Sequence, residues 1–207
     1  MIEFKENYYE DQKFNNLVID KKEIQGITFQ NCTFNNCSFR ETIFRMCKFR
    51  ECTFKEGDLS LIQVDGSTFS RTRFEDLKLI GVNWVMGSWG KKEIQQSLKS
   101  LDFENCVLNY STFMGLTLQR SLIRKCIAKE VDFSDADLKL ADCTYTDFEN
   151  SRFSNTDLTE ADLRGATNYF IVPHLNILKK TKFSLPDALS LLYNLDIIIN
   201  DPSENES

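Results

Sequence analysis

The residue types in this chain that could carry out chemistry are seven cysteines, one histidine and many carboxylates. A zinc site needs cysteines at metal-ligand spacing, and a disulfide framework needs an oxidising compartment. No Cys-x-x-Cys pair occurs, and Cys32, Cys37, Cys47 and Cys52 are separated by multiples of five residues. This spacing favours reduced packing residues, so no metal or other cofactor is expected.

The single histidine, His174, follows Pro173 near the end of the sequence. No serine, cysteine or carboxylate pair forms a motif around it, so a catalytic triad or a histidine–metal centre cannot be assembled. Neither a Walker loop nor a GxGxxG sequence occurs. The sequence therefore predicts that the protein is not an enzyme and has no catalytic residues.

A period of five residues runs through most of the chain. Counting in fives from Phe14 gives a hydrophobic residue each time up to Trp84, and the count resumes in a shifted phase from Phe103 to Leu163. A second, usually smaller series lies two residues before each of these positions and holds most of the cysteines. Because the period is neither that of a helix nor that of a strand, the backbone must turn a corner every five residues. We predict a solenoid in which both series face inward and the other three positions face water.

The stretches Ala136–Leu140 and Ala161–Gly165 resemble the A(D/N)LXX unit of the pentapeptide-repeat proteins, and the repetition covers residues 14–166. The resemblance implies an all-β fold, a right-handed quadrilateral parallel β-helix with about 20 residues per coil. We expect this solenoid to carry one loop insertion and a short C-terminal helix. Neighbouring coils should pair through parallel backbone ladders.

The composition along the chain predicts segments around and within the repeat. The loop includes Trp89, which lies between two glycines and is followed by Lys91 and Lys92. Two interpretations stay open: these residues form an exposed binding site, or Trp89 folds back over the edge of the coil. The predicted segments are an N-terminal cap (1–13), the repeat (14–166) with its loop (85–97), a C-terminal strap, helix and short strand (167–200), and a disordered tail (201–207).

The C-terminal helix is expected to begin with Ser184 as its N-cap and to have Asp187 in its first turn. Its apolar stripe can cap the last coil, bind a second copy of the chain, or do both. We expect a homodimer formed through this helix. The candidate dimerisation residues are Leu185, Ala188, Leu189, Leu192, Leu195, Ile197 and Ile199.

The formal net charge of -6 conceals an uneven distribution. Residues 130–163 hold ten acidic residues against Lys139 and Arg152, whereas residues 40–55 are locally basic. The acids should spread over all faces of the rod and attract a basic partner, although solvation of the surface explains them as well. The candidate partner-binding residues are Asp132, Asp135, Asp137, Asp142, Asp147, Asp157, Asp162, Trp89, Lys91 and Lys92.

Two functions remain. The rod resembles the Qnr-type topoisomerase-protection proteins, which implies a DNA mimic that binds DNA gyrase or topoisomerase IV and protects against quinolones. The single insertion and the basic N-terminal coils depart from that pattern. The other function is a rigid scaffold for an unassigned protein partner, and residues 168–200 favour it because they resemble the tail of bacterial pentapeptide-repeat proteins without an assigned role. Direct binding of nucleic acid is not expected, because an acidic rod repels phosphate.

The first residues, Met1 to Asn7, are charged and contain no apolar run. Neither a signal peptide nor a membrane span is therefore predicted. We expect a cytoplasmic protein with no membrane partner.

Overall fold

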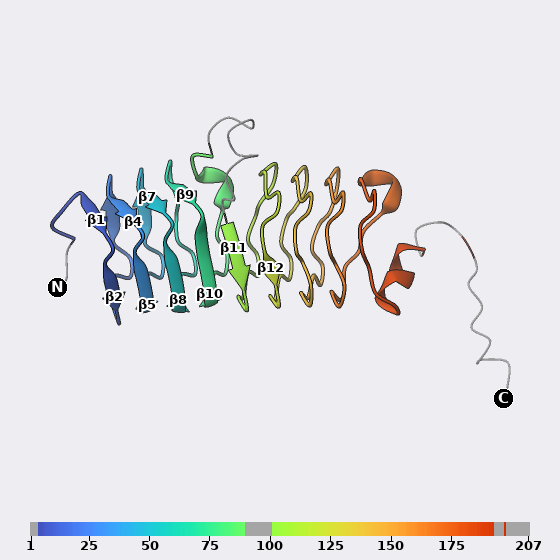
Figure 1. Ribbon diagram of the computed structural model, residues 1–207, viewed down its shortest axis with the longest axis horizontal. Coiled ribbons are helices and arrows are strands. Elements are labelled where there is room, and N and C mark those ends of the chain that lie inside the picture. The colour runs from blue at the N-terminus through green and yellow to red at the C-terminus, as the bar shows by residue number, and fades with distance from the viewer. Residues whose placement is uncertain (1–3, 90–100, 193–196, 198–207) are drawn as a thin grey trace.

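The computed structural model describes residues 4–89, 101–192 and 197. It is a straight rod of stacked coils with the N-terminal and C-terminal segments at opposite ends (Figure 1). Each coil has four faces, and the same face returns after 20 residues, as in the parallel pairing of Phe34 with Phe54. The expected all-β solenoid is therefore confirmed.

Face 1 carries the longest sheet, whose strands are all parallel and whose inward residues include Phe34 and Phe54. β5, β8 and β10 are long enough to continue around the corner onto face 2. The sheet has six strands: β2 (Lys13–Asn15), β5 (Thr33–Ser38), β8 (Thr53–Asp58), β10 (Thr72–Lys78), β11 (Leu101–Glu104) and β12 (Ile123–Arg124).

The other faces follow in chain order. Face 2 contains Phe39, and beyond β5, β8 and β10 it is held by isolated bridges such as Ile127 with Asp147. Face 3 contains Phe44 and begins with β3 (Glu23–Gln25) paired to β6 (Ile43–Arg45). Face 4 contains Phe49 and holds β1 (Tyr8–Glu10), β4 (Thr28–Gln30), β7 (Lys48–Arg50) and β9 (Thr68–Ser70).

The core is a set of aromatic stacks that follow the axis of the rod. Phe34 and Phe54 stack with ring centroids 4.5 Å apart, and Phe113 and Phe133 do so at 5.3 Å. Rings on adjacent faces meet edge to face, as Phe44 and Phe49 do at 5.3 Å. The larger inward series therefore fills the rod with contacts in the two geometries that aromatic pairs prefer.

The corners explain the period of five. The fifth residue of most repeats has a positive φ, and non-glycine side chains such as Asn31 (51°) and Glu160 (59°) occupy these positions. The left-handed conformation costs free energy for such residues, so the stacked neighbours must enforce it. One such residue per five turns the chain from each face to the next.

The smaller inward series has a hydrogen-bonding role. The hydroxyl of Ser67 donates to the carbonyl of Phe44 at 2.8 Å, and the hydroxyl of Thr156 donates to the carbonyl of Phe133 at 2.9 Å. Cys47 makes the same contact through its thiol, to the carbonyl of Ile24 at 3.2 Å. A small donor is thus favoured at this position because it satisfies a buried carbonyl of the preceding coil.

The insertion adds nine residues, because Phe74 pairs with Phe103, a separation of 29 residues against 20 between Phe54 and Phe74. The count in fives does not stop at Trp84: Trp89 takes the next inward place, on face 4, and stacks on Phe69 at 6.2 Å. The short 3-10 helix η1 (Trp84–Met86) begins at Trp84 and precedes Trp89 in the chain. Most of the predicted loop falls outside the described residues.

The coils also begin before Phe14. β1 pairs with β4, and Tyr9 stacks on Phe29 at 5.5 Å. Phe4 lies across the end of the rod, with its ring 5.2 Å from that of Phe29. Part of the segment predicted as a cap is thus a strand of face 4.

The C-terminal segment differs from the prediction. Its described residues contain two 3-10 helices, η2 (Pro173–Leu175) and η3 (Asp187–Leu191), and η3 has Pro186 at its N-cap. Ser184 is not the N-cap, because its hydroxyl accepts the amide hydrogen of Gly165 at 3.1 Å. The expectation of a helix capped by Ser184 was wrong, since docking onto the last coil uses that hydroxyl. No helix in the described residues is long and apolar enough to cross a membrane.

Candidate functional site

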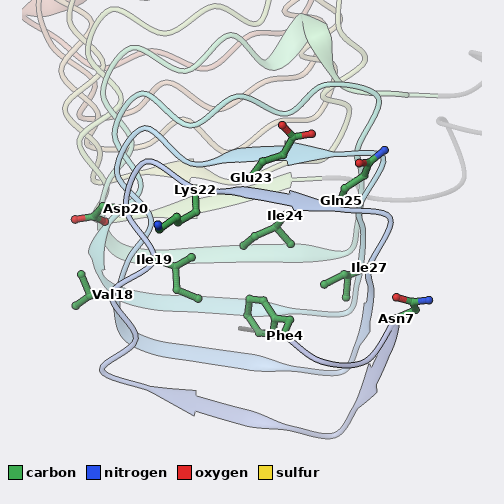
Figure 2. Close-up of a pocket in the computed structure, with 10 residues that line it drawn as sticks. All are labelled: Phe4, Asn7, Val18, Ile19, Asp20, Lys22, Glu23, Ile24, Gln25 and Ile27. Atoms are coloured by element: carbon green, nitrogen blue, oxygen red, sulfur yellow. The ribbon is translucent and has the colours of Figure 1, made fainter. Parts of the chain in front are cut away.

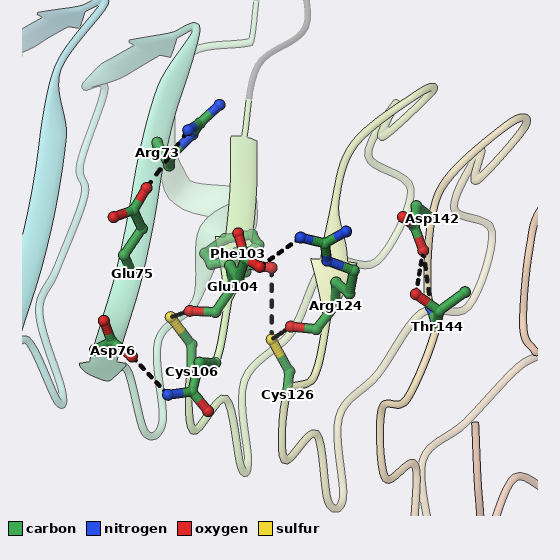
Figure 3. Close-up of polar contacts among 11 residues, drawn as sticks. Arg73, Glu75, Asp76, Phe103, Glu104, Cys106, Arg124, Cys126, Asp142 and Thr144 are labelled. Carbon is green, nitrogen blue, oxygen red and sulfur yellow. Dashed lines mark hydrogen bonds and ion pairs between the residues drawn. The ribbon is translucent and has the colours of Figure 1, made fainter. Parts of the chain in front are cut away.

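The seven cysteines are free and buried. In Figure 3 the Cys106 thiol donates to the carbonyl of Glu104 at 3.4 Å, and the Cys126 thiol donates to the carbonyl of Phe103 at 3.6 Å. Burial raises the pKa of Cys52 to about 12. A thiol with a raised pKa is a poor nucleophile and a poor metal ligand, so these residues serve the core. The described residues contain no cluster of histidine, cysteine and carboxylate side chains that could hold a metal ion.

The aspartates of residues 130–163 lie on all four faces, as the sequence predicted. They occupy the outward position just before the larger inward residue, and bridges align them from coil to coil, as Asp137 with Asp157 and Asp142 with Asp162. The first pair lies on face 4 and the second on face 1. Asp132 lies on face 3, Asp147 on face 2, and Asp135 at the exposed corner after face 3.

Each aspartate at this outward position also holds the turn that follows it. One carboxylate oxygen accepts the backbone N–H two residues ahead, as from Thr159 to Asp157 at 3.0 Å and from Arg164 to Asp162 at 3.1 Å. Figure 3 shows the same contact between Asp142 and Thr144. Such a short-range bond stabilises a turn at the residue types that favour it. The aspartates thus have a role in the fold, whatever else they bind.

Most of these carboxylates are partly neutralised by bases from neighbouring coils. Lys129 contacts Glu149 at 2.5 Å and Asp147 at 3.4 Å. Lys182 lies 3.7 Å from Asp162, beside Arg164 at 2.7 Å. Residues 129–182 contain the same ten acids and seven bases, so their net charge is -3. The bases are Lys129, Lys139, Arg152, Arg164, Lys179, Lys180 and Lys182. The strong local excess inferred from residues 130–163 is therefore reduced by pairing across coils.

Two aspartates have a lowered pKa. The side chain of Arg164 is the main cause of the lowered pKa of Asp162. For Asp157, burial alone would raise the pKa, but hydrogen bonds from Thr159 and Lys139 outweigh it and lower the pKa. Both carboxylates are therefore ionised throughout the neutral pH range.

Three acids in this region make no ion pair with any described residue: Glu130, Asp135 and Asp142. Asp135 accepts a hydrogen bond from the side chain of Asn155 at 2.7 Å, and Asp142 from the hydroxyl of Thr144 at 2.6 Å. Glu130 and Asp135 occupy exposed corners on either side of face 3. We call these three residues the free acids, because none of them has an ion-pair partner among the described residues.

The basic stretch of residues 40–55 is partly paired as well. Arg45 contacts Glu23 at 2.8 Å and Asp65 at 3.4 Å. Lys48 and Arg50, both exposed on face 4, make no ion pair with a described residue. Lys55, on face 1, makes no ion pair with a described residue either, so the free positive charge of this stretch lies on two faces.

The predicted site at the insertion is only partly described. The indole of Trp89 is half-buried, packs on Phe69 and donates to the carbonyl of Trp84 at 2.8 Å. This position favours the interpretation in which Trp89 covers the coil. Lys91 and Lys92 lie outside the described residues, so binding at this segment stays a prediction.

The C-terminal segment contains residues that pack on the core and the candidate dimerisation residues. Phe183 and Leu191 pack against the core, so this segment does cap the last coil. Leu185 and Ile197 are exposed, by 77% and 52%, and their role in dimerisation stays a prediction. Of the other candidates, Leu189 is exposed, Ala188 and Leu192 are half-buried, and Leu195 and Ile199 lie outside the described residues.

The N-terminal end of the rod contains a cavity of about 360 Å³. Figure 2 shows Phe4, Ile19, Ile24 and Ile27 pointing into the interior of the first coil, whereas Glu23 points away from it. The isoleucines are only 6 to 8% exposed. The cavity therefore lies at the end of the core, and its lining also includes five polar residues: Asn7, Asp20, Lys22, Glu23 and Gln25.

Sequence reasoning missed one surface, the apolar residues on the outer side of face 3. Met46 and Met86 are 54% and 53% exposed, at positions where other coils place a polar residue or glycine. Their appearance in the polar series was the signal that could have found them.

Two family models match the chain. The model described as "Pentapeptide repeat region" matches residues 27–98, and that described as "Pentapeptide repeats (8 copies)" matches residues 118–155 and 132–167. Together they cover more than half of the 207 residues. The search of curated proteins found no match.

Solved structures share the fold at low sequence identity. HetL, a pentapeptide repeat protein involved in heterocyst differentiation regulation from the cyanobacterium Nostoc sp. strain PCC 7120, is 15% identical with a TM-score of 0.51, covering 88% of this chain and 93% of its own. A trypsin-treated variant of QnrB1, a plasmid-mediated fluoroquinolone resistance protein, is 19% identical with a TM-score of 0.46, covering 94% of this chain and 92% of its own. At these identities the likeness to HetL supports the fold alone.

Proposed function

Because the chain belongs to the pentapeptide-repeat family, we propose that it acts as a rigid, non-enzymatic scaffold that binds a protein partner through its outer faces. The observation that supports this most is the filled interior, because aromatic stacks and other buried apolar side chains occupy the described core. Any recognition must then use outward side chains. Rigid faces with fixed coil spacing favour this, because little conformational entropy is lost on binding.

The free acids Glu130, Asp135 and Asp142 are the proposed contact residues for a basic partner. None of the three has an ion-pair partner among the described residues, so a partner's lysines and arginines would not have to displace an internal base from an ion pair. Exposed charge pairs contribute mainly to association rate and specificity. The partner should therefore bind faster at low ionic strength.

This function is tested by affinity capture with the full chain from a bacterial lysate. The matched variant carries Glu130→Gln, Asp135→Asn and Asp142→Asn, which remove charge while the side-chain acceptors remain. We expect a partner retained by the natural chain and depleted with the variant. A control with Glu41→Gln and Glu51→Gln, acids paired with Lys21 and Arg71, should retain it. Equal recovery with all three chains would contradict binding through the free acids.

A DNA mimic that binds a type II topoisomerase is the second candidate. The observation that favours it is the presence of carboxylates on all four faces of the same coils. The bases that pair with most of them work against it, because they reduce the field that a positive DNA-binding groove would meet. A homodimer through the exposed C-terminal residues Leu185 and Ile197 belongs to this candidate.

A DNA supercoiling assay with purified gyrase, with and without a quinolone, distinguishes the scaffold from the DNA mimic. A mimic would inhibit supercoiling or relieve the drug's effect, and Asp137→Asn, Asp157→Asn and Asp162→Asn together would abolish this. These substitutions leave the acceptor of each turn in place. Absence of any effect from the natural chain would remove the mimic and leave the scaffold.

A further inference from the structure

Three methionines lie on the outer side of face 3 in the central part of the rod. Met46, Met86 and Met114 are 54%, 53% and 47% exposed, and Val85 between them is 36% exposed. Val85 and Met114 follow Trp84 and Phe113, whose rings stack across neighbouring coils at 6.0 Å. Val85 and Met114 are therefore neighbours on successive coils, and Met46 lies two coils before Met86 on the same face. We call these four residues the methionine ridge: Met46, Val85, Met86 and Met114. Exposed apolar residues of this kind on a soluble protein mark an interaction surface.

Glycines separate the methionines at the corner of face 3. The corner positions of successive coils are Gly26, Met46, Gly66, Met86 and Gly115. Backbone hydrogen bonds align these coils: the N–H of Met46 donates to the carbonyl of Asp65, and the N–H of Gly66 donates to the carbonyl of Met86. A Cβ on Gly66 would lie only 3.5 Å from Cγ of Met46, so the methionine side chain lies over the glycine. The two methionines are thus projections two coils apart, at about 9.6 Å.

A shallow groove of about 710 Å³ lies beside the ridge on the same face. Its lining includes Met86 and Leu61, which is 47% exposed. The charged residues of the lining are paired, Lys21 with Glu41 at 3.6 Å and Asp65 with Arg45 at 3.4 Å. The surface is therefore a shallow groove that has exposed apolar side chains at Leu61 and Met86.

The free charges beside Met46 are positive. Arg45 is held by Glu23 and Asp65 on face 3. Lys48 and Arg50 follow Met46 around the corner onto face 4, where both are exposed and neither forms an ion pair with a described residue. A partner that covers Met46 would thus meet unpaired positive charge at its border.

We propose that the methionine ridge docks an amphipathic α-helix of a partner protein, with aspartate or glutamate bordering its apolar side. A helix rises about 10.5 Å over seven residues, which matches the two-coil spacing of Met46 and Met86. Apolar residues at i and i+7 would lie beside the two methionines, and those at i+3 and i+4 would enter the groove. Methionine suits such a contact because its side chain adapts to different partner shapes. The acids of the helix would meet Lys48 and Arg50.

This surface goes beyond the proposed binding of a basic partner by the free acids. Met46 and Met86 lie in the first half of the rod, where the free charges beside Met46 are positive, whereas Met114 lies one coil before the free acid Asp135. The scaffold would then hold two different partners at a fixed separation. Loss of one surface should leave the other intact.

The probe is a synthetic amphipathic peptide with leucine at i, i+3, i+4 and i+7 and glutamate elsewhere, labelled with a fluorophore and titrated with the full chain. A peptide of the same composition with the leucines dispersed around the helix is the control ligand. We expect saturable anisotropy with the first peptide alone. The double substitution Met46→Gln and Met86→Gln should weaken binding by about tenfold, because it removes the apolar contacts.

Leu140→Gln provides the matched control variant, since Leu140 is also an exposed corner residue with positive φ but lies on face 4. Its affinity should equal that of the natural chain, and circular dichroism should show all variants folded. Lys48→Gln with Arg50→Gln should flatten the salt dependence of binding. Equal binding of both peptides, or no loss in the methionine variant, would overturn the proposal. A natural chain that self-associates through the ridge, and separates in the methionine variant, would assign the surface to a second copy and also overturn it.

Discussion

The two halves of the rod reach the same coil geometry in different ways. Of the twelve largest fully buried side chains, eight lie between Phe29 and Trp84, and the inward positions of the second half include Ala136, Ala141 and Ala161. In the second half, six aspartates hold the following turn through a carboxylate oxygen, whereas in the described first half the carboxylate of Asp58 and the side-chain amide oxygen of Asn83 do so. The comparison teaches that one fold is stabilised by aromatic stacking at one end and by turn hydrogen bonds at the other.

The largest expected effect is the loss of a ring from the first half. Phe54 is 1% exposed and stacks between Phe34 at 4.5 Å and Phe74 at 5.2 Å. Phe54→Ala should lower the free energy of unfolding by about 3 to 5 kcal/mol, since it leaves a cavity in a stack. Cys143→Ala, at the inward position of the same face in the second half, should cost about 1 kcal/mol. Urea unfolding followed by circular dichroism measures both, and similar losses would contradict the contrast between the halves.

The next effect concerns a glycine of the first half. A Cβ on Gly57 would lie 2.0 Å from the carbonyl oxygen of Cys37, and its φ is +125°. Gly57→Ala should therefore cost about 3 kcal/mol. Gly115→Ala in the second half meets nothing within 4 Å, and only its φ of +71° opposes it, so the loss should be about 1 kcal/mol. Thermal unfolding of both variants decides this, and equal melting temperatures would contradict it.

A smaller effect should appear in the turns of the second half. Asp157→Ala removes the acceptor for the Thr159 amide and the ion pair with Lys139 at 2.9 Å, and should cost about 1 kcal/mol. Asp157→Asn keeps an acceptor oxygen and should lose less. Chemical unfolding of the two variants provides the comparison. An asparagine variant as unstable as the alanine variant would show that the charge, and not the turn bond, matters.

The smallest effect is the dependence of stability on pH. The folded pKa values of Asp157 and Asp162 are lowered, so the stabilisation is fully present above the unfolded pKa, about 3.9, and is lost as pH falls through the folded values. We expect a change of less than about 1 kcal/mol for each group. Unfolding at a series of acidic pH values should show a shallower decline in Asp162→Asn. An unchanged profile would mean that other carboxylates dominate.

The sequence predicted the solenoid and its buried cysteines because these depend on residues five apart, whereas the four faces were implied by the resemblance to the pentapeptide-repeat proteins. It did not predict the position of Trp89, since the count was ended at Trp84 before its next inward place. The charge of the acidic region was overestimated because pairing joins residues one coil apart, as Lys129 with Glu149. Ser184 was misassigned because its hydroxyl is used by a residue 19 positions away, Gly165. Contacts between coils therefore account for each of these differences.

The methionine ridge was also not predicted from the sequence, because it too depends on how successive coils are stacked. Met46 and Met86 are ordinary residues in sequence, and only the return of face 3 every 20 residues places them on one face. Asp135 and Asp142 were among the candidate partner-binding residues and Glu130 was not, and the lack of ion pairs at all three was not predicted. Spacing in a repeat thus predicts the face of a residue, whereas its free charge depends on the neighbours above and below.

The most direct measurement is the affinity of a captured partner for the full chain at increasing ionic strength, by calorimetric titration. Binding through the free acids predicts an affinity that falls as salt rises. It also predicts a much smaller salt dependence for the Glu130→Gln, Asp135→Asn, Asp142→Asn variant. An affinity that is unchanged by both salt and these substitutions would contradict the scaffold's proposed mode of recognition.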